Sequence, residues 1–118
     1  KIAKVLASAA DAIILDLEDS VAPANKSAAR GLVRELDPST GPELWVRINP
    51  LGSEWHSADI DVIGNAALKG IVLPKAESGA DIIELAHRTG SIPIHAIVTE
   101  TAASLFGLLS YREPGSPL

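Results

Sequence analysis

Ionisable side chains recur at the ends of four short apolar segments in this chain. They are Asp16, Glu18 and Asp19 after the first segment, Arg47 within the second, Lys75 and Glu77 after the third, and Glu100 after the fourth. Carboxylates are hard oxygen ligands of the kind that Mg²⁺ binds, and a guanidinium offers a planar fork for a carboxylate or a phosphate. Mixed charge of this kind suits an anionic substrate held through a divalent cation. It also suits chemistry that forms a carbanion beside a metal-polarised carbonyl.

The four apolar segments predict buried β-strands, because they are short, rich in Ile and Val, and bounded by turn residues. They are Ala12–Leu15, Leu44–Ile48, Gly70–Leu73 and Ile94–Val98. Apolar residues at helical spacing predict helices over 1–9, 26–36, 57–68, 78–88 and 101–110. The second of these helices places Leu32 and Val33 on its apolar face, and Ser78 followed by Asp81 resembles a capping box at the start of the fourth.

Strands that alternate with helices imply right-handed crossovers and a parallel sheet. The two candidate architectures are a doubly wound sheet and part of a (β/α)8 barrel. No GxGxxG or GxxxxGK[ST] motif follows any predicted strand, which weakens the nucleotide-binding form of the first. In both architectures ligands bind where the carboxyl ends of the strands meet, so we expect the ionisable set to gather at that edge. We expect one domain over residues 1–111 and a C-terminal tail over 112–118.

The composition, with 47% hydrophobic and 21% charged residues, is sufficient to build a core. The net charge of −5 argues against a nucleic-acid surface, which would need clustered Lys and Arg. No apolar run approaches the roughly 18 residues needed to span a bilayer, and the absence of cysteine excludes disulfides and thiolate metal sites. We therefore expect a cytoplasmic enzyme or binding domain without a nucleic-acid or membrane partner.

Each ionisable residue also has an ordinary structural interpretation. A single acid after a strand commonly caps a helix, and Asp16 could serve only to bond loop amides. The histidines do not form a convincing metal set. His87 falls on the solvated side of a predicted helix, His95 falls within a strand, and His56 falls in a loop where a surface role is expected. Recurrence after four consecutive strands favours a site, although it does not specify a reaction.

Four motifs together carry a family resemblance. "DAIILDLEDSVAPANKSAAR", "WVRINPLGSEWHSADID", "GIVLPKAES" and "TETAASL" occur in this order and cover roughly residues 1–107. In this combination they resemble the citrate lyase β-subunit-like branch of the HpcH/HpaI aldolase family. The resemblance implies a (β/α)8 barrel and a Mg²⁺-dependent carbon–carbon lyase. The implied substrates are small-molecule citryl, malyl or related β-hydroxyacyl thioesters of coenzyme A or acyl carrier protein, cleaved to an acyl thioester and a 2-oxo acid.

The same resemblance implies roles for individual residues. Arg47 resembles the substrate-binding arginine, with Asn49 beside it as a second substrate-binding residue, and Glu100 resembles the Mg²⁺-ligating glutamate. Glu18 and Asp19 resemble the acids that organise the water shell of the metal and the nearby basic groups. Lys75 resembles a lysine at the rim beside them. The resemblance therefore implies a catalytic set that comprises Arg47, Glu18, Asp19 and Lys75.

The chain also departs from this family in length. A (β/α)8 barrel needs about 250 residues, so we expect these 118 residues to hold four of the eight strands. The second Mg²⁺ ligand of the family, an Asp after the next strand, is absent from this sequence. We expect a fragment or truncated form whose open strand edges pair in a homo-oligomer. Three alternatives stay open: an active lyase, whole in a longer chain or completed by oligomerisation; a non-catalytic binding or assembly module; and a general α/β metabolite-binding domain.

Overall fold

The computed structural model describes residues 2–36, 41–64 and 66–112, and side chains from residue 4 onward. Its strands are β1 (Ala12–Asp16), β2 (Glu43–Arg47), β3 (Gly70–Leu73) and β4 (Ile94–Ala96). Its α-helices are α1 (Ile2–Leu6), α2 (Lys26–Arg34), α3 (His56–Ile63), α4 (Gly79–Thr89) and α5 (Ala102–Gly107). Two 3₁₀ helices, η1 (Pro23–Asn25) and η2 (Leu108–Arg112), complete the described chain. Of the predicted C-terminal tail, only Arg112 lies within the described residues, at the end of η2.

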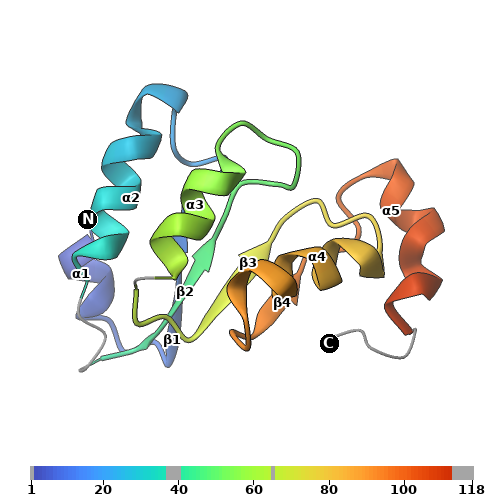
Figure 1. The fold of residues 1–118 in the computed structure, drawn as a ribbon. Helices are drawn as coiled ribbons and strands as arrows, with labels where there is room; N and C mark the ends of the chain where they lie inside the picture. The colour runs from blue at the N-terminus through green and yellow to red at the C-terminus, as the bar shows by residue number, and fades with distance from the viewer. Residues whose placement is uncertain (1, 37–40, 65, 113–118) are drawn as a thin grey trace.

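The four strands form one parallel sheet in the order β1-β2-β3-β4. Helices α2, α3 and α4 form a layer on one face of this sheet (Figure 1). A sheet in sequential order with its crossover helices on one face is a segment of a barrel, because a doubly wound sheet carries helices on both faces. The predicted partial (β/α)8 barrel is therefore confirmed.

The core lies between the sheet and this helical layer. Every second strand residue faces the helices, since side chains alternate along a strand. The largest buried side chains of the core are Leu17, Leu44, Val46, Ile48, Ile63, Ile71, Leu73, Ile82 and Leu85. Val33 of α2 joins this cluster, and Leu32 lies at its margin, 50% exposed, where it lines a hollow together with Leu15, Ala29 and Val33.

Within the part of the chain that the structure describes, no helical layer covers the opposite face of the sheet. The prediction of buried strands holds along the whole length of β3 alone among the described strands, since Ile14 of β1 is 61% exposed and His95 of β4 is exposed. Trp45 lies across this face with its ring 6.4 Å from that of His95, centroid to centroid, and edge-on to it. A Cβ on Gly70 would lie 2.2 Å from the Trp45 ring, so only glycine leaves room for the indole.

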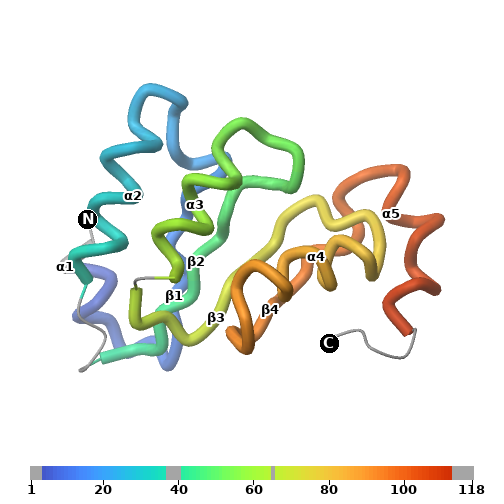
Figure 2. The backbone as a smooth tube through the Cα atoms, viewed as in Figure 1, coloured from blue at the N-terminus to red at the C-terminus, as the bar shows by residue number. Residues whose placement is uncertain are grey.

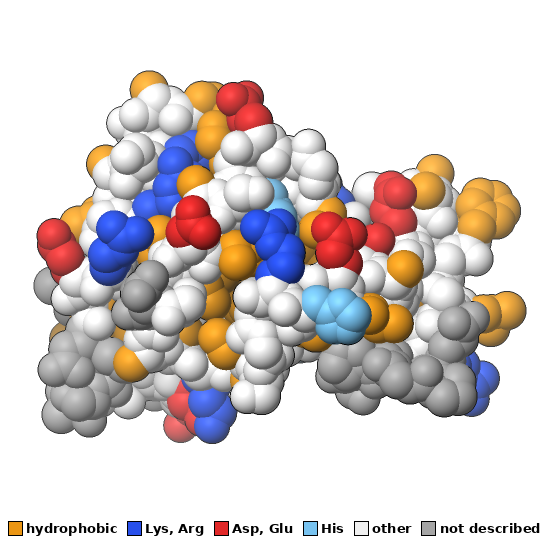
Figure 3. Space-filling model, viewed as in Figure 1, with side chains coloured by type: hydrophobic (Ala, Val, Ile, Leu, Met, Phe, Trp, Pro, Cys, Tyr) orange, Lys and Arg blue, Asp and Glu red, His pale blue; other side chains and the backbone are white. Residues whose placement is uncertain are grey.

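Two predicted helices end earlier than expected. Helix α3 stops at Ile63 instead of residue 68, because Gly64 follows and the chain must reach β3 at Gly70. Helix α5 stops at Gly107 instead of residue 110 and tightens into η2. Exposed hydrophobic side chains stand out at this end of the molecule (Figure 3). A Cβ on Gly107 would lie 1.8 Å from the carbonyl oxygen of Glu77, so α5 approaches the chain before α4 more closely than any other residue type would allow.

Helix α4 begins as predicted. Ser78 is its N-cap, and the capping box with Asp81 is present, with the Ser78 amide donating to Asp81 Oδ2 at 3.1 Å. Strand β4 is shorter than predicted, although the amide of Ile97 still donates to the carbonyl of Leu73. No helix in the described ranges is long and apolar enough to cross a membrane.

Candidate functional site

The loops that follow β1, β2 and β3 rise at one end of the molecule, where the strands have their carboxyl ends (Figure 2). Six of the residues singled out from the sequence gather there through direct contacts. This rim cluster comprises Asp16, Glu18, Asp19, Arg47, Lys75 and Glu100. The expectation that the strands deliver ionisable groups to a common edge is therefore met in the geometry.

Glu18 lies at the centre of the rim cluster and is buried, with 2% of its surface exposed. Its Oε1 accepts a short hydrogen bond from Lys75 Nζ, and its Oε2 lies 3.2 Å from Arg47 Nη1. A buried carboxylate is costly unless it is paired, and here two cations from two neighbouring strands compensate it. The hydrogen bond that Lys75 donates to Glu18 raises the pKa of Lys75, and nearby acids act in the same direction while burial opposes it, so the ammonium stays charged.

Asp16 orients the guanidinium of Arg47. Arg47 Nε donates to Asp16 Oδ1 at 2.9 Å and Nη2 donates to Oδ2 at 2.5 Å, across the paired ends of β1 and β2. Burial acts to raise the pKa of Asp16, but hydrogen bonds from Arg47, from Ser20 and from the Glu18 amide outweigh it and hold that pKa well below its usual range. The same pair raises the pKa of Arg47. Asp16 also bonds the loop amides of Glu18 and Ser20, so its structural interpretation applies as well.

Lys75 occupies the turn after β3 with a φ of 52°, the one positive φ among the described non-glycine residues. This left-handed conformation costs roughly 1–3 kcal/mol for a residue with a side chain. Its amide donates to Glu100 Oε2 at 2.7 Å, which links the turn to the loop after β4. The acid that Lys75 contacts is Glu18, while Glu77, its neighbour in sequence, accepts a hydrogen bond from Thr101 Oγ1 at 3.0 Å.

The members of the rim cluster differ in their access to solvent. Asp19 has 71% of its side chain exposed and lies 3.8 Å from Lys75 Nζ at the outer margin. Glu100 is exposed as well, and Arg47 and Lys75 are part-exposed. A ligand could therefore touch these four side chains, whereas Glu18 lies beneath them.

Asn49 takes a different place from its predicted neighbour Arg47. It is buried, its Nδ2 donates to Leu17 O at 2.9 Å and to Asp59 Oδ2 at 2.6 Å, and its Oδ1 accepts from Lys26 Nζ at 2.7 Å. These protein partners occupy both N–H groups and the carbonyl oxygen of the side chain. The geometry therefore favours a structural role for Asn49 in place of direct contact with a substrate.

The partners of Asn49 form a supporting network under the rim that sequence reasoning missed. It comprises Lys26, Arg30, Asn49, His56 and Asp59. Asp59 Oδ1 pairs with Arg30 Nη1 at 3.0 Å, and Asp59 Oδ2 also accepts from the Asn49 amide at 2.8 Å. The expected surface role of His56 is wrong: the ring is buried, with Nδ1 2.9 Å from the carbonyl oxygen of Asn49. His87 and His95 are exposed, as predicted for His87.

The rim cluster alone does not complete a metal site. Its four carboxylates against two cations leave a formal excess of two negative charges, which fits a divalent cation. Glu100 offers an exposed carboxylate of the right chemistry. However, no group of three or more His, Asp or Glu side chains within the described ranges is placed to hold a metal ion.

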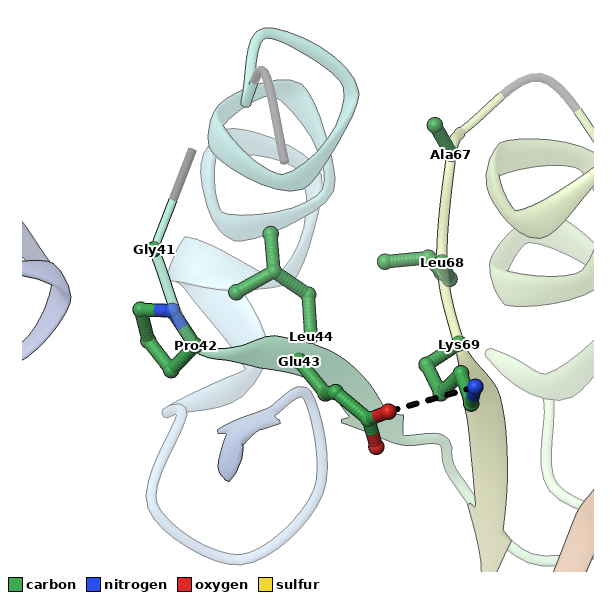
Figure 4. A pocket seen from close by; sticks show the side chains of 7 residues that line it. All are labelled: Gly41, Pro42, Glu43, Leu44, Ala67, Leu68 and Lys69. Atoms are coloured by element: carbon green, nitrogen blue, oxygen red, sulfur yellow. Dashed lines mark ion pairs between the residues drawn. The ribbon is translucent and has the colours of Figure 1, made fainter. Parts of the chain in front are cut away.

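A hollow of about 380 Å³ lies at the opposite edge of the sheet, where β2 and β3 begin (Figure 4). It is lined by Gly41, Pro42, Glu43, Leu44, Ala67, Leu68 and Lys69. Its charged groups are Glu43 and Lys69, an exposed ion pair at 3.2 Å. A single exposed pair of this kind has little catalytic use, because its charges already satisfy each other in solvent.

A comparison with known families matches most of the chain. Residues 1–103 match the profile of the family described as HpcH/HpaI aldolase/citrate lyase. The chain belongs to this family. Among curated relatives, a citrate lyase subunit beta-like protein of Mycobacterium tuberculosis is 48% identical over 84 residues, covering 70% of this chain and 30% of the relative. A (3S)-malyl-CoA thioesterase of Cereibacter sphaeroides is 36% identical over 100 residues, covering 82% of this chain and 35% of the relative.

Solved structures of HpcH/HpaI family members superpose on the chain. The citrate lyase β subunit of M. tuberculosis, complexed with oxaloacetate and magnesium, matches with a TM-score of 0.70 and 38% identity, covering 85% of this chain and 42% of that one. The protein CitE of M. tuberculosis, in complex with magnesium, acetoacetate and coenzyme A, matches with a TM-score of 0.71 and 38% identity, covering 85% and 35%. The chain spans about a third of the length of the curated relatives it matches.

Proposed function

We propose that the rim cluster is part of a Mg²⁺-dependent carbon–carbon lyase site for a citryl, malyl or related β-hydroxyacyl thioester. The observation that carries this proposal is the buried Glu18 carboxylate, held between Arg47 and Lys75 at the carboxyl edge of the sheet. Family membership and the relatives named as citrate lyase β subunits support the reaction class. The magnesium in the matched complexes supports the cofactor.

The proposed reaction breaks the bond between the α-carbon of the thioester and the carbon that bears the hydroxyl group. That carbon becomes the carbonyl of a 2-oxo acid as its hydroxyl proton leaves. The electron pair of the broken bond passes to the acyl thioester as an enolate, which then takes up a proton. The site must therefore hold an anionic substrate and stabilise negative charge on the enolate oxygen.

Arg47 would bind a carboxylate of the substrate. Its two hydrogen bonds to Asp16 use two of its five N–H groups and fix the plane of the guanidinium, and Nη1 forms an ion pair with Glu18. The remaining N–H groups therefore meet a ligand from a set orientation. Lys75, kept charged by Glu18, would stabilise the enolate oxygen. Asp19 would order water at the outer margin, and Asn49 would position the site from beneath.

Glu100 would be the protein ligand that this chain supplies to Mg²⁺. Its Oε2 accepts a hydrogen bond from the backbone amide of Lys75, which sets the carboxylate beside the turn that carries the Lys75 ammonium. Mg²⁺ commonly binds through one or two carboxylates and shares its sphere with water and substrate oxygens, which fits a single glutamate at an exposed rim. Bound there, the ion supplies a Lewis acid that polarises a carbonyl oxygen.

The direct test is Mg²⁺-dependent cleavage of malyl- and citryl-CoA by the 118-residue chain, with the acyl thioester and the 2-oxo acid measured separately. We expect Glu100→Gln and Arg47→Met each to lower the rate by ~10²-fold or more, because each removes a charge that faces the substrate. Glu84→Gln on α4, an exposed helix position, is the matched control and should leave the rate unchanged. Absence of turnover at high protein concentration, with the chain folded, would exclude catalysis by this chain.

Hydrolysis is the second candidate, since a relative that covers 82% of this chain is named (3S)-malyl-CoA thioesterase. Hydrolysis releases a free thiol and a hydroxy acid, whereas lysis leaves the thioester intact and yields an oxo acid. The same assay therefore separates the two reactions. A chain that binds malyl-CoA but forms neither set of products would be a binding module. Size-exclusion chromatography with and without malyl-CoA would show whether a homo-oligomer forms to complete the site.

A further inference from the structure

Lys26 is an unusual residue in the supporting network. It opens α2 and is buried, and its ammonium donates three hydrogen bonds of 2.7 Å, to Leu17 O, Glu18 O and Asn49 Oδ1. Three donors are all that an ammonium has, so the group is fully bonded. Its ammonium nitrogen also lies 4.9 Å from the centroid of the Trp55 ring. Lysine is rarely buried, because removing its ammonium from water costs considerable desolvation free energy.

Two of the Lys26 acceptors are consecutive backbone carbonyls of the loop after β1. Leu17 O also accepts from Asn49 Nδ2 at 2.9 Å, so side chains from α2 and from the end of β2 grip the same peptide. This loop carries Glu18, whose carboxylate meets Lys75 and Arg47 on the other side. Lys26 thus holds the backbone of Glu18 from beneath, while the Glu18 carboxylate pairs with Arg47 and Lys75 above.

We propose that Lys26 is a positioning residue that fixes the Glu18 carboxylate between Arg47 and Lys75 through the Leu17 and Glu18 carbonyls. Lys26 does not face the substrate in this account and acts only through Glu18. The account predicts that removal of the ammonium changes the rim cluster even where the fold survives. As a catalytic claim it rests on the lyase activity proposed above.

The first experiment does not depend on activity. We would measure the pKa of the Lys75 ammonium by ¹³C NMR of ε-labelled lysine in the wild type, in Lys26→Met and in Lys69→Met. Methionine keeps an unbranched side chain only one atom shorter than lysine and has no donors. Lys69 lies at the opposite edge of the sheet in an exposed pair. We expect Lys26→Met to lower the pKa of Lys75 toward its ordinary value of 10.5, because Glu18 no longer stays beside it, and Lys69→Met to leave it unchanged. An unchanged pKa in folded Lys26→Met overturns the proposal.

The second experiment is a double-mutant cycle on turnover with Lys26→Met and Glu18→Gln. We expect Lys26→Met alone to lower kcat by ~10–100-fold with less than ~3-fold change in KM, the size typical of supporting residues. In the Glu18→Gln background the same substitution should cost less than ~3-fold, because Lys26 acts through Glu18. Equal losses in both backgrounds overturn the proposal.

The two experiments separate this inference from the proposed function. If the wild type shows no turnover, the lyase proposal fails and the NMR measurement alone decides the role of Lys26. If Lys26→Met does not fold, Lys26→Gln replaces it in both experiments, since an amide retains an N–H donor for the carbonyls. Lys26→Gln should then lower the pKa of Lys75 and kcat, each by less than the fall expected for Lys26→Met. A folded Lys26→Gln whose Lys75 pKa and kcat both equal those of the wild type overturns the proposal.

Discussion

Asp59 is the one acid of the supporting network, and its removal should be costly. Its side chain is fully buried, accepts two hydrogen bonds from Asn49, at 2.8 Å and 2.6 Å, and pairs with Arg30 at 3.0 Å. Asp59→Ala would leave two buried Asn49 donors without partners, at about 1–3 kcal/mol each, and would strip Arg30 of its counter-charge. Breaking a buried pair by removing one partner typically costs about 3–5 kcal/mol, and we expect a loss in that range.

Urea unfolding at pH 7 measures this loss, because the midpoint scales with the free energy of unfolding. With a slope of about 2 kcal/mol/M, a cost of about 4 kcal/mol lowers the midpoint by about 2 M. Such a loss is a large share of the roughly 5–15 kcal/mol that stabilises a typical domain. Glu84→Ala, at an exposed position on α4, is the control and should change stability by less than about 0.5 kcal/mol. A loss below about 1 kcal/mol for Asp59→Ala would refute the view that Asp59 anchors the network.

Three further predictions concern the rim and the end of the described chain. Lys75→Gly should be more stable than Lys75→Ala by about 1 kcal/mol in urea unfolding. Both variants lose the pair with Glu18, but only alanine is strained in the left-handed conformation of this turn. Equal free energies of unfolding would argue against strain at this turn. The pKa of Asp16 is lower in the folded state than in the unfolded state, so the wild type should be more stable than Asp16→Asn above about pH 4. The difference in the free energy of unfolding should shrink as the pH falls further. A difference that stays constant from pH 7 to pH 3 would contradict the lowered pKa of Asp16. Gly107→Ala should lower the free energy of unfolding by about 1–3 kcal/mol, because the added Cβ meets the Glu77 carbonyl. It should also speed amide hydrogen exchange in α4 near residue 79. Exchange rates equal to those of the wild type would count against the close approach.

The strands and the edge they share could be predicted from the sequence. Short apolar segments rich in Ile and Val mark parallel strands, and the residues after them meet at one edge whatever the exact strand ends. The order of burial within that edge could not be predicted. Glu18 and Asp19 are neighbours of the same charge, yet one is buried between two cations and the other is exposed. Only the direction in which the loop leaves β1 decides between them.

The supporting network was hidden from sequence reasoning for two physical reasons. Lys26 bonds mainly to backbone carbonyls, which carry no residue identity, and Asn49 lies 23 residues away. Lysine is also rarely buried, so nothing in the sequence singled out Lys26, and the surface role expected for His56 was wrong. The pairing of a helix start with a strand end becomes visible only when the crossover between them is built.

The positions of the tryptophans give the molecule two separate optical reporters. The sequence holds two tryptophans, and they lie in different surroundings. Trp55 faces the buried ammonium of Lys26, whereas Trp45 covers Gly70 and meets His95 on the sheet face without helices. In a Trp45→Phe variant, fluorescence from Trp55 reports on the supporting network beneath the rim. In a Trp55→Phe variant, fluorescence from Trp45 reports on any partner that covers the sheet face without helices. Ligand binding and association of chains can thus be observed independently in the same protein.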